Sequence, residues 1–398
     1  MHPGEVLIRQ LELVVALTGS QNEPSPGAMR NCERARSARP KQLGDECDLG
    51  WGVSLASVVT RRIAIPLIDP YARRVKDLRI SITDRCNFRC TYCMPAEGMQ
   101  WLPRDEVLSY EEIARIARVC VEHFGFEAIR ITGGEPLIRA HIVRLFEMLQ
   151  PLGVDLALTT NGVKLPELAH DLKAAGLNRV NISLDSLRRE RFLAMTRRDE
   201  LDRVLLGIDA AIDAGLGPVK INAVVIRGVN DDEVVDLAAF GRDRGVGMRF
   251  IEFMPLDADD KWDASQVMPA GEILARINEV YPLHRIAATP GHIQPADRYE
   301  YLDGIGDVGV IASVTEPFCE NCDRVRITAE GRFRTCLFAI DEFDLRAVVR
   351  APDGLAAVDL DDRLANAITA AVGTKWAGHR IGSNEFVRPD RSMSQIGG

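Results

Sequence analysis

Short apolar runs alternate with longer amphipathic stretches between residues 78 and 253. The short runs are rich in β-branched residues, which is typical of buried strands, and the longer stretches repeat apolar residues at helical spacing. The pattern predicts six βα units, with strands at 78–83, 128–132, 156–160, 180–184, 219–226 and 248–253.

The ends of the predicted helices carry recognisable signals. Residues 109–112 read as a capping box, and Gly125, Gly176 and Gly215 stand where helices should stop. Consecutive βα units give parallel strands with right-handed crossovers. Because six units are too few to close a standard barrel, we expect an α/β fold: a partial (β/α)6 TIM-like barrel, open on one side. Its active site, and with it the motifs, should gather at the carboxyl ends of the strands.

The regular alternation ends after Pro255, and a Gly-, Pro- and Asp-rich segment leads to a helical stretch near 360–372. We therefore predict a barrel at 66–255 and a C-terminal accessory domain at 256–398 that covers the open side. Residues 1–65 show no sustained period, so we expect a disordered leader. A transit peptide, or a start codon placed too far upstream, is the alternative.

Composition and charge narrow the class of protein. A chain of 398 residues that is 46% hydrophobic can bury a full core, and it contains no run of about 18 apolar residues that would cross a membrane. The net charge of -9 argues against DNA or RNA as a general partner, because neutralising phosphates needs a basic surface. Six of the nine cysteines form two tight triplets, which is ligand spacing in a reducing compartment, and we expect a cytoplasmic protein.

The first triplet is Cys86, Cys90 and Cys93, which follow the first predicted strand directly. Three thiolates would leave one iron of a 4Fe-4S cluster free to bind a substrate or cofactor. A zinc site is the alternative, although structural zinc prefers four closed ligands and no fourth Cys or His lies nearby in the sequence.

The second triplet is Cys319, Cys322 and Cys336. It again predicts a cluster with an open iron, here beside Arg324 and Arg326, which a strand would direct to one face. Guanidinium groups beside an open iron suit an anionic substrate that carries nitrogen and oxygen. Zinc with His379 as a fourth ligand explains this triplet equally well when it is taken alone.

Residues 304–309 match the dinucleotide fingerprint GxGxxG letter for letter. The fingerprint requires a preceding strand and a following helix, but residues 310–314 read as a strand. We therefore expect these glycines to form turns.

The first triplet resembles that of the radical S-adenosylmethionine superfamily, whose open iron holds the amino and carboxylate groups of that cofactor. Gly133, Gly134 and Glu135, at the end of the second strand, resemble the site of the methionine amine. There, glycines let backbone approach a ligand and the carboxylate could receive an ammonium group. The cofactor contacts that this resemblance implies are Tyr92, Gly134, Ser183 and Met254.

Both triplets, together with residues 323–326 and 393–398, resemble the GTP 3′,8-cyclase family of molybdenum-cofactor biosynthesis. The resemblance runs from about residue 67 to the last residue and implies two 4Fe-4S clusters, S-adenosylmethionine and GTP. The implied GTP contacts are Arg79, Arg130, Thr159, Lys220, Arg324, Val325 and Arg326, with Thr160 as the alternative to Thr159. The resemblance also implies catalytic roles for Arg79, in the last reduction step, and for Gly397 and Gly398, which should reach into the active site.

The family's reaction is that of a radical lyase. One electron cleaves S-adenosylmethionine, the resulting 5′-deoxyadenosyl radical takes hydrogen from ribose carbon 3′, and that carbon attacks carbon 8 of guanine. Reduction then yields (8S)-3′,8-cyclo-7,8-dihydroguanosine 5′-triphosphate. The resemblance implies an electron donor such as flavodoxin or ferredoxin and, as the next enzyme, cyclic pyranopterin monophosphate synthase, and it is compatible with a homodimer.

Two other functions explain part of the sequence. Another radical enzyme with an auxiliary 4Fe-4S cluster would act on a peptide or a haem precursor, but such enzymes usually carry more auxiliary cysteines. A zinc or iron-sulfur redox sensor without catalysis would explain the two triplets, but not the six βα units or the Gly-Gly-Glu sequence.

Overall fold

The computed structural model describes residues 64–287, 294–351 and 357–397. A strand lies at each of the six predicted positions, and the six strands pair in chain order, all parallel. They are β3 (Asp77–Ser81), β4 (Ala128–Thr132), β5 (Asp155–Thr160), β6 (Arg179–Ser183), β7 (Lys220–Val225) and β8 (Gly247–Glu252). The predicted α/β partial barrel is confirmed.

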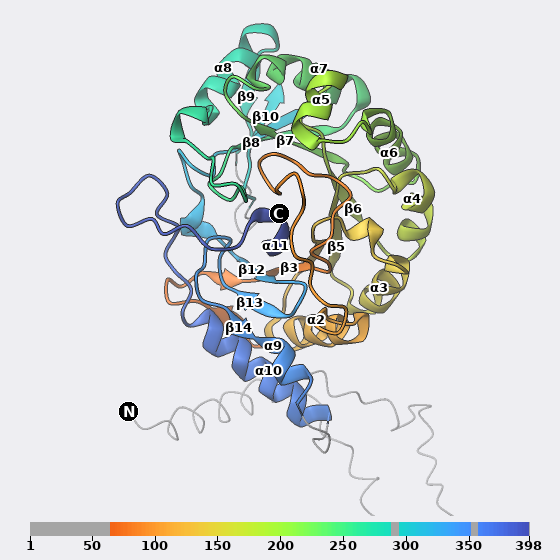
Figure 1. Cartoon of the computed structure of the whole chain (residues 1–398), viewed down its shortest axis with the longest axis vertical. Helices are drawn as coiled ribbons and strands as arrows, with labels where there is room; N and C mark the ends of the chain where they lie inside the picture. Colours follow the sequence, from red (N-terminus) through yellow and green to blue (C-terminus); the bar gives the residue numbers. More distant parts are fainter. Residues whose placement is uncertain (1–63, 288–293, 352–356, 398) are drawn as a thin grey trace, which may run out of the picture. The chain divides into compact units, whose positions relative to one another are not determined.

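Helices surround the strands on the outside, as Figure 1 shows. They are α2 (Tyr110–Phe124), α3 (Ile142–Leu149), α4 (Leu165–Ala174), α5 (Arg189–Thr196), α6 (Leu201–Asp213) and α7 (Val234–Arg244). The predicted capping box is present at the start of α2, where Ser109 and Glu112 bond to each other's main chain. The same helix ends at Gly125, whose φ of 68° lies in the left-handed region.

Strands from the C-terminal part extend the barrel sheet at both edges. β12 (Arg324–Ile327) pairs in parallel with β3, and β11 (Asp307–Ile311) pairs in parallel with β8. Antiparallel strands follow on each side: β13 (Arg332–Arg334) and β14 (Phe343–Asp344) beyond β12, and β10 (Asp297–Tyr301) and β9 (Leu283–Arg285) beyond β11. The accessory segment thus shares its sheet with the barrel.

The remaining elements lie at the rim and in the centre of the barrel. β1 (Leu67–Ile68) and β2 (Arg74–Val75) form a separate hairpin. The other helices are α8 (Ala270–Val280), α9 (Leu345–Val349), α10 (Ala357–Val372) and α11 (Met393–Ile396). In Figure 1, α11 lies inside the ring of strands. Most of the predicted leader, residues 1–63, lies outside the described residues, and the boundaries at 65 and 255 remain predictions.

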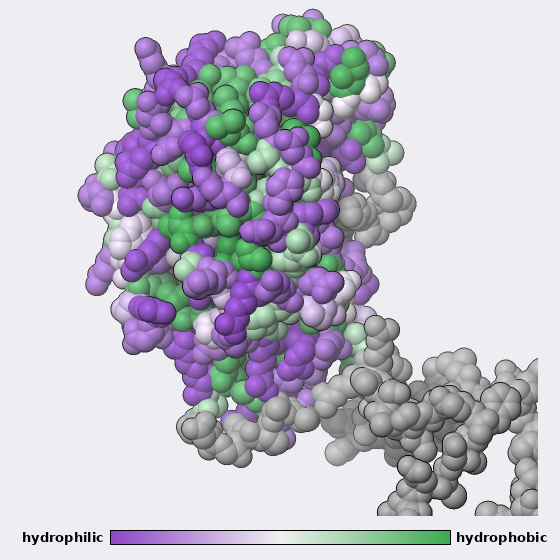
Figure 2. Space-filling model, turned by 90° about the vertical axis from the view of Figure 1, so that its right-hand side faces the viewer, coloured by the Kyte–Doolittle hydropathy of each residue, from purple (hydrophilic) through white to green (hydrophobic). Residues whose placement is uncertain are grey.

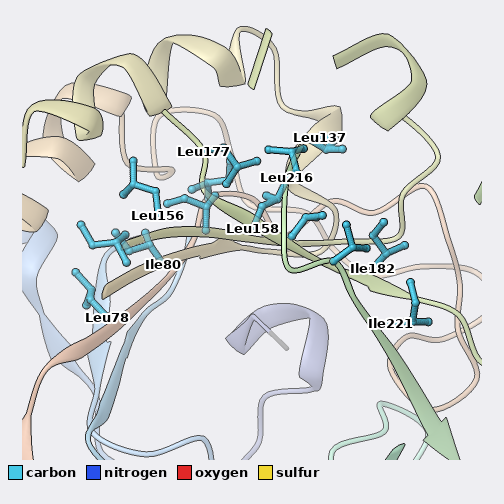
Figure 3. Packing of buried hydrophobic residues seen from close by; sticks show 14 of the residues in the cluster. Leu78, Ile80, Leu137, Leu156, Leu158, Leu177, Ile182, Leu216 and Ile221 are labelled. Atoms are coloured by element: carbon cyan, nitrogen blue, oxygen red, sulfur yellow. The ribbon is translucent and has the colours of Figure 1, made fainter. Parts of the chain in front are cut away.

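The main hydrophobic core lies between the strands and the outer helices. Figure 3 shows side chains such as Leu78 and Ile80 on the helix-facing side of the sheet, with α11 on the opposite side. Side chains alternate along a strand, so the two neighbours of Leu78, Asp77 and Arg79, face inward. A closed barrel fills its interior with branched apolar side chains, whereas polar residues here line an internal cavity.

The glycines of residues 304–309 behave as the sequence predicts. Gly304 and Gly306 have φ angles of 75° and 83°, and they lie in the turn between β10 and β11. A strand, not a helix, follows them, so the dinucleotide fingerprint is excluded.

Figure 2 shows a face on which hydrophilic residues predominate and hydrophobic ones form separate patches. Across the described ranges, each helix is too short or too polar to cross a bilayer.

Candidate active site

A cavity of about 960 Å³ occupies the barrel, and all six cysteines of the two triplets line it. The first triplet follows the carboxyl end of β3. The second lies at the other end, because Cys322 precedes β12, which runs parallel to β3 with Arg324 opposite Asp77. The prediction that all motifs gather at the carboxyl ends is therefore wrong for the second triplet, since the two triplets lie at opposite ends of one cavity.

Burial governs the chemistry of the first triplet. Desolvation raises the pKa of Cys86 and of Cys93 to about 12 and that of Cys90 well above its ordinary value. A thiolate at these positions therefore needs a strong local positive charge, which iron supplies. Three thiols on one loop that line the same cavity fit a 4Fe-4S cluster with one open iron.

The two glycines after β4 make room for the chain itself. A Cβ at Gly134 would lie 2.4 Å from the carbonyl oxygen of Arg85, and a Cβ at Gly133 would lie 2.6 Å from that of Thr83. The Gly134 amide donates to Thr83 across 2.8 Å, and the Glu135 amide donates to Arg85 across 2.8 Å. The close approach expected for a ligand is thus made first by the cysteine loop, which these glycines hold against β4.

The Glu135 carboxylate is already engaged by the protein. It accepts hydrogen bonds from the Leu137 amide at 2.9 Å, the Thr160 hydroxyl at 2.7 Å and the Asn161 amide at 2.7 Å. Burial raises the pKa of Glu135 to about 7 although these bonds favour the ionised form. A carboxylate offers about four lone-pair sites, so one is left for an ammonium group. Through these three bonds Glu135 also ties the end of β4 to the end of β5.

Tyr92, Gly134, Ser183 and Met254 all line the cavity. The Tyr92 hydroxyl donates to Asp185 at 2.6 Å, and the Val224 amide donates to the other carboxylate oxygen at 2.9 Å. Burial raises the pKa of Asp185 to about 6. Sequence reasoning missed Asp185, although an acidic residue two positions after the end of β6 was a usable signal.

The second triplet is covered by the segment that follows α10. A Cβ at Gly378 would lie 2.7 Å from the Cβ of Cys319, and the His379 main chain hydrogen-bonds to the Cys319 sulfur. The His379 ring packs on Phe338, with centroids 5.0 Å apart. Among the described residues, no group of three or more His, Cys, Asp or Glu side chains is arranged to hold a single metal ion, so the zinc alternative gains no support.

A row of arginines crosses the inner face of the sheet. Arg326, Arg79 and Arg130 are register partners on β12, β3 and β4, and Arg179 follows on β6 beyond the small Ala157. Within the described ranges, Arg79 Nε and both Arg130 Nε and Nη1 are buried without a hydrogen-bond partner. Burial, and then neighbouring arginines, lower the pKa of each of Arg79, Arg130 and Arg326.

A second polar row lies nearer the carboxyl ends. Thr159, Asn181 and Lys220 are register partners, and Asn222 stands opposite Arg249 on β8. The Oδ1 atoms of Asn181 and Asn222 are buried and lack a donor in the part of the chain that is described. Sequence reasoning missed both amides and Arg249, although polar residues at alternate positions of buried strands are the signal of a lined cavity.

The two adjacent threonines of β5 differ in what they contact. Thr160 is buried, and its hydroxyl both donates to Glu135 and accepts from the Gly162 amide at 3.0 Å. Both threonines line the cavity, but the Thr160 hydroxyl already bonds to Glu135 and so joins the ends of β4 and β5.

Val325 and the C-terminal tail complete the set of expected contacts. The Val325 side chain is fully buried in the hydrophobic core, on the face of β12 opposite Arg324 and Arg326. Gly397 lies against the inner strands, since a Cβ there would meet Thr132 at 2.8 Å. Gly398 lies outside the described residues.

A partial parallel barrel with three cysteines on the loop after its first strand defines the radical S-adenosylmethionine class, and the radical SAM superfamily matches residues 80–241. The Molybdenum Cofactor Synthesis C family matches residues 246–381. A GTP 3′,8-cyclase of Streptomyces coelicolor is 47% identical over 343 residues, which cover 85% of this chain and 98% of that relative. One of Paenarthrobacter nicotinovorans is 46% identical over 84% of this chain and 97% of its own length. The chain belongs to the GTP 3′,8-cyclase family.

Likeness to solved structures is weaker. A crystal structure of Streptococcus suis SuiB bound to precursor peptide SuiA is 16% identical, with a TM-score of 0.48, over 86% of this chain and 78% of that one.

Proposed function

We propose that the chain converts GTP to (8S)-3′,8-cyclo-7,8-dihydroguanosine 5′-triphosphate, the first step of molybdenum-cofactor biosynthesis, with S-adenosylmethionine and two 4Fe-4S clusters. The observation that carries the proposal is one cavity with a cysteine triplet at each end and, between them, buried arginine nitrogen atoms that have no hydrogen-bond partner in the described part of the chain. The bound cofactors supply an electron and an organic radical. The protein supplies position, charge and exclusion of water.

S-adenosylmethionine binds at the carboxyl ends of the strands in this proposal. Cys86, Cys90 and Cys93 hold the first cluster. Tyr92, Gly134, Ser183 and Met254 line the adjoining wall of the cavity, where they contact the cofactor. The hydrogen bond from Tyr92 to Asp185 fixes the phenol ring, and Asp185 therefore orients this wall.

GTP binds in the proposal between the two ends, with guanine on the cluster of Cys319, Cys322 and Cys336. Strand β3 has five residues and is about 16 Å long, and the two triplets lie beyond opposite ends of this part of the sheet. A nucleoside triphosphate is long enough to occupy this space. The triphosphate meets Arg79, Arg130 and Lys220, and buried nitrogen atoms of Arg79 and Arg130 have no hydrogen-bond partner among the described residues.

Individual residues fit the proposal to different degrees. Thr159 is favoured over Thr160 as a GTP contact, because the Thr160 hydroxyl already donates a hydrogen bond to Glu135. Val325 can contribute only main-chain atoms, because its side chain faces the core. Arg79 lines the cavity beside Arg326, where it can assist the final reduction of the base. Gly397 and Gly398 act through the tail that Arg326 holds.

Several parts of the proposal concern partners. The reaction needs a one-electron donor of the flavodoxin or ferredoxin type, and its product passes to cyclic pyranopterin monophosphate synthase. We place the reaction in the cytoplasm, where thiols stay reduced. A homodimer is compatible with this proposal and is not required by it.

Anaerobic reconstitution followed by an assay tests the proposal. The chain should take up about eight irons, as two four-iron clusters require. With GTP, S-adenosylmethionine and dithionite it should form a cyclised nucleotide that mass spectrometry and NMR identify. A colourless zinc protein would overturn the radical reaction. Cleavage of S-adenosylmethionine that leaves GTP unchanged would favour a different substrate, such as a peptide.

A further inference from the structure

Lys375 is a buried cation beside the second triplet. It lies three residues after α10 and is only 3% exposed. Its Nζ donates to the carbonyl oxygen of Arg324 at 2.8 Å and to that of Thr335 at 2.5 Å. The same nitrogen lies 3.9 Å from the sulfur of Cys322. The ammonium group thus contacts two main-chain oxygens and one candidate metal ligand.

The two carbonyl groups belong to the two segments that carry the cysteines. Arg324 follows Cys322 by two residues and begins β12, whereas Thr335 directly precedes Cys336. One ammonium group therefore bridges the cysteine-bearing ends of these segments, beyond the last paired residues of β12 and β13. Without it, two buried carbonyl oxygens would lose their donor, which costs about 1–3 kcal/mol for each.

The charge of Lys375 has no carboxylate partner within the described residues. A buried ammonium that meets only neutral carbonyl groups is costly, because it has lost its hydration without gaining a counterion. Negative charge at the triplet would compensate it. Three thiolates and the sulfides of a cluster provide that charge at the Cys322 end of the site.

Cys319 is held separately, by a different cation. Arg73 donates to the Cys319 carbonyl oxygen at 2.6 Å and to that of Ala377 at 2.6 Å, and it pairs with Asp69. Because Arg73 has a carboxylate partner, its charge is already compensated. Its remaining donors hold the main chain of Cys319 and Ala377 in place. Lys375, like Arg324, instead directs its charge at the Cys322 sulfur.

We infer that Lys375 is a positioning residue for the second cluster: its ammonium group fixes the segments of Cys322 and Cys336 and places a positive charge against the cluster. The inference rests on the two-cluster part of the proposed function. Positive charge and hydrogen bonds at a cluster's sulfurs favour its reduced state. Lys375 therefore makes the second cluster easier to reduce and leaves the first cluster unaffected.

The test uses the full chain with the substitutions Lys375→Gln, Lys375→Met and Lys375→Arg. Gln is neutral but still donates hydrogen bonds, Met removes both properties, and Arg restores the charge. Lys173→Gln is the matched control, since Lys173 is exposed on α4 and its side chain bonds only to Gly215 among the described residues. Iron and sulfide per chain, and the reduction potential of each cluster by EPR-monitored titration, are measured for every variant.

Lys375→Gln should retain about eight irons while one of the two potentials moves to a more negative value. Lys375→Met should lose up to half of the iron, because the cysteine segments separate as well, and Lys375→Arg should restore most of it. Unchanged potentials and iron content in both Lys375→Gln and Lys375→Met would overturn the inference. An unaltered chain that binds only one cluster would instead overturn the two-cluster proposal, so the two failures are distinguishable.

Discussion

Arg326 donates a hydrogen bond to the main-chain carbonyl oxygen of Gly397 and so links strand β12 to the C-terminal tail inside the barrel. The guanidinium group is buried, and repulsion from Arg79 and Arg324 adds to the lowering of its pKa. A carbonyl dipole is a neutral partner, which leaves the remaining donors of Arg326 and its full charge available to the cavity. The tail is thereby part of the wall that a nucleotide meets.

Gly397→Ala should displace this tail. Gly397 has a φ of 82°, and an added Cβ would lie 2.8 Å from Thr132 Cγ2 and 3.1 Å from the Cβ of Ser81. We expect cyclisation to fall at least tenfold, while the iron content and the cleavage of S-adenosylmethionine are kept; deletion of the last two residues should act likewise. Gly382→Ala is the control, because Gly382 has a φ of 83° but nothing within 4 Å of the added Cβ. Equal losses in both variants would show that backbone strain, and not the position of the tail, is responsible.

Cys86→Ala and Cys120→Ala should have opposite effects. Cys86 lines the cavity in the first triplet, whereas Cys120 is fully buried in the apolar core on α2. The first variant should lose about four of eight irons and all cleavage of S-adenosylmethionine. Cys120→Ala should keep all eight irons and the cleavage of S-adenosylmethionine. It should lose only about 1–2 kcal/mol of unfolding free energy, because a small cavity replaces the thiol. Product analysis and chemical denaturation measure the two effects. Normal cleavage by Cys86→Ala would contradict the assignment of the first triplet.

The barrel could be predicted from the sequence because its signals are local. Buried strands β3 to β8 carry β-branched runs, and Ser109 and Gly125 mark the ends of α2. The strands of the C-terminal part were largely missed, since β13 and β14 have only three and two residues and depend on their neighbours for pairing. Short strands carry too few positions for alternation to be recognised.

In the site, too, residues placed by the local sequence pattern could be predicted, whereas residues placed by tertiary contacts could not. Alternation along β12 correctly placed Arg324 and Arg326 on one face, and it also explains why Val325 faces the core. Lys375 could not be predicted, because its contacts are with residues 40 to 53 positions away. A lone lysine after a helix is ordinarily exposed, and only tertiary packing buries it.

Arg130→Met should stabilise the chain without nucleotide and weaken nucleotide binding. Two nitrogen atoms of Arg130 are buried without a partner among the described residues, and Arg79 and Arg179 add like-charge repulsion. Removing the charge should raise the unfolding free energy by about 1–3 kcal/mol. Affinity for GTP should fall about ten- to hundredfold through the loss of charge-assisted hydrogen bonds.

Calorimetric titration with GTP and thermal unfolding of the unliganded protein measure both effects of Arg130→Met. Arg144→Met is the control, because Arg144 is an exposed residue paired with Glu111 on the outer helices. This control should leave both quantities nearly unchanged. A destabilised Arg130→Met chain with normal GTP affinity would show that Arg130 is structural.

Lys220 should make GTP binding depend on pH. Burial, and then repulsion from Arg249, Arg179, Arg130 and Arg298, lower its pKa from 10.5 to about 8. The unliganded folded chain therefore releases this proton near pH 8, whereas the unfolded chain keeps it until about pH 10.5. Because the unfolded chain binds more protons in this window, Lys220 destabilises the fold below pH 8, and this effect is relieved as pH rises toward 10.5.

Binding of a triphosphate has the opposite dependence on pH. The anion prefers the protonated ammonium group, so GTP affinity should decline as pH rises above about 8 while the stability of the unliganded chain increases. Phosphate groups have lost their last proton below this range and guanine N1 titrates only at higher pH, so a slope near pH 8 belongs to the protein. Lys220→Met should weaken GTP binding at pH 7 and flatten both slopes between pH values of about 7.5 and 8.5. Dissociation constants for GTP and thermal unfolding, measured across that range, test the two predicted pH dependences. Slopes that persist in Lys220→Met would assign the titration to another group.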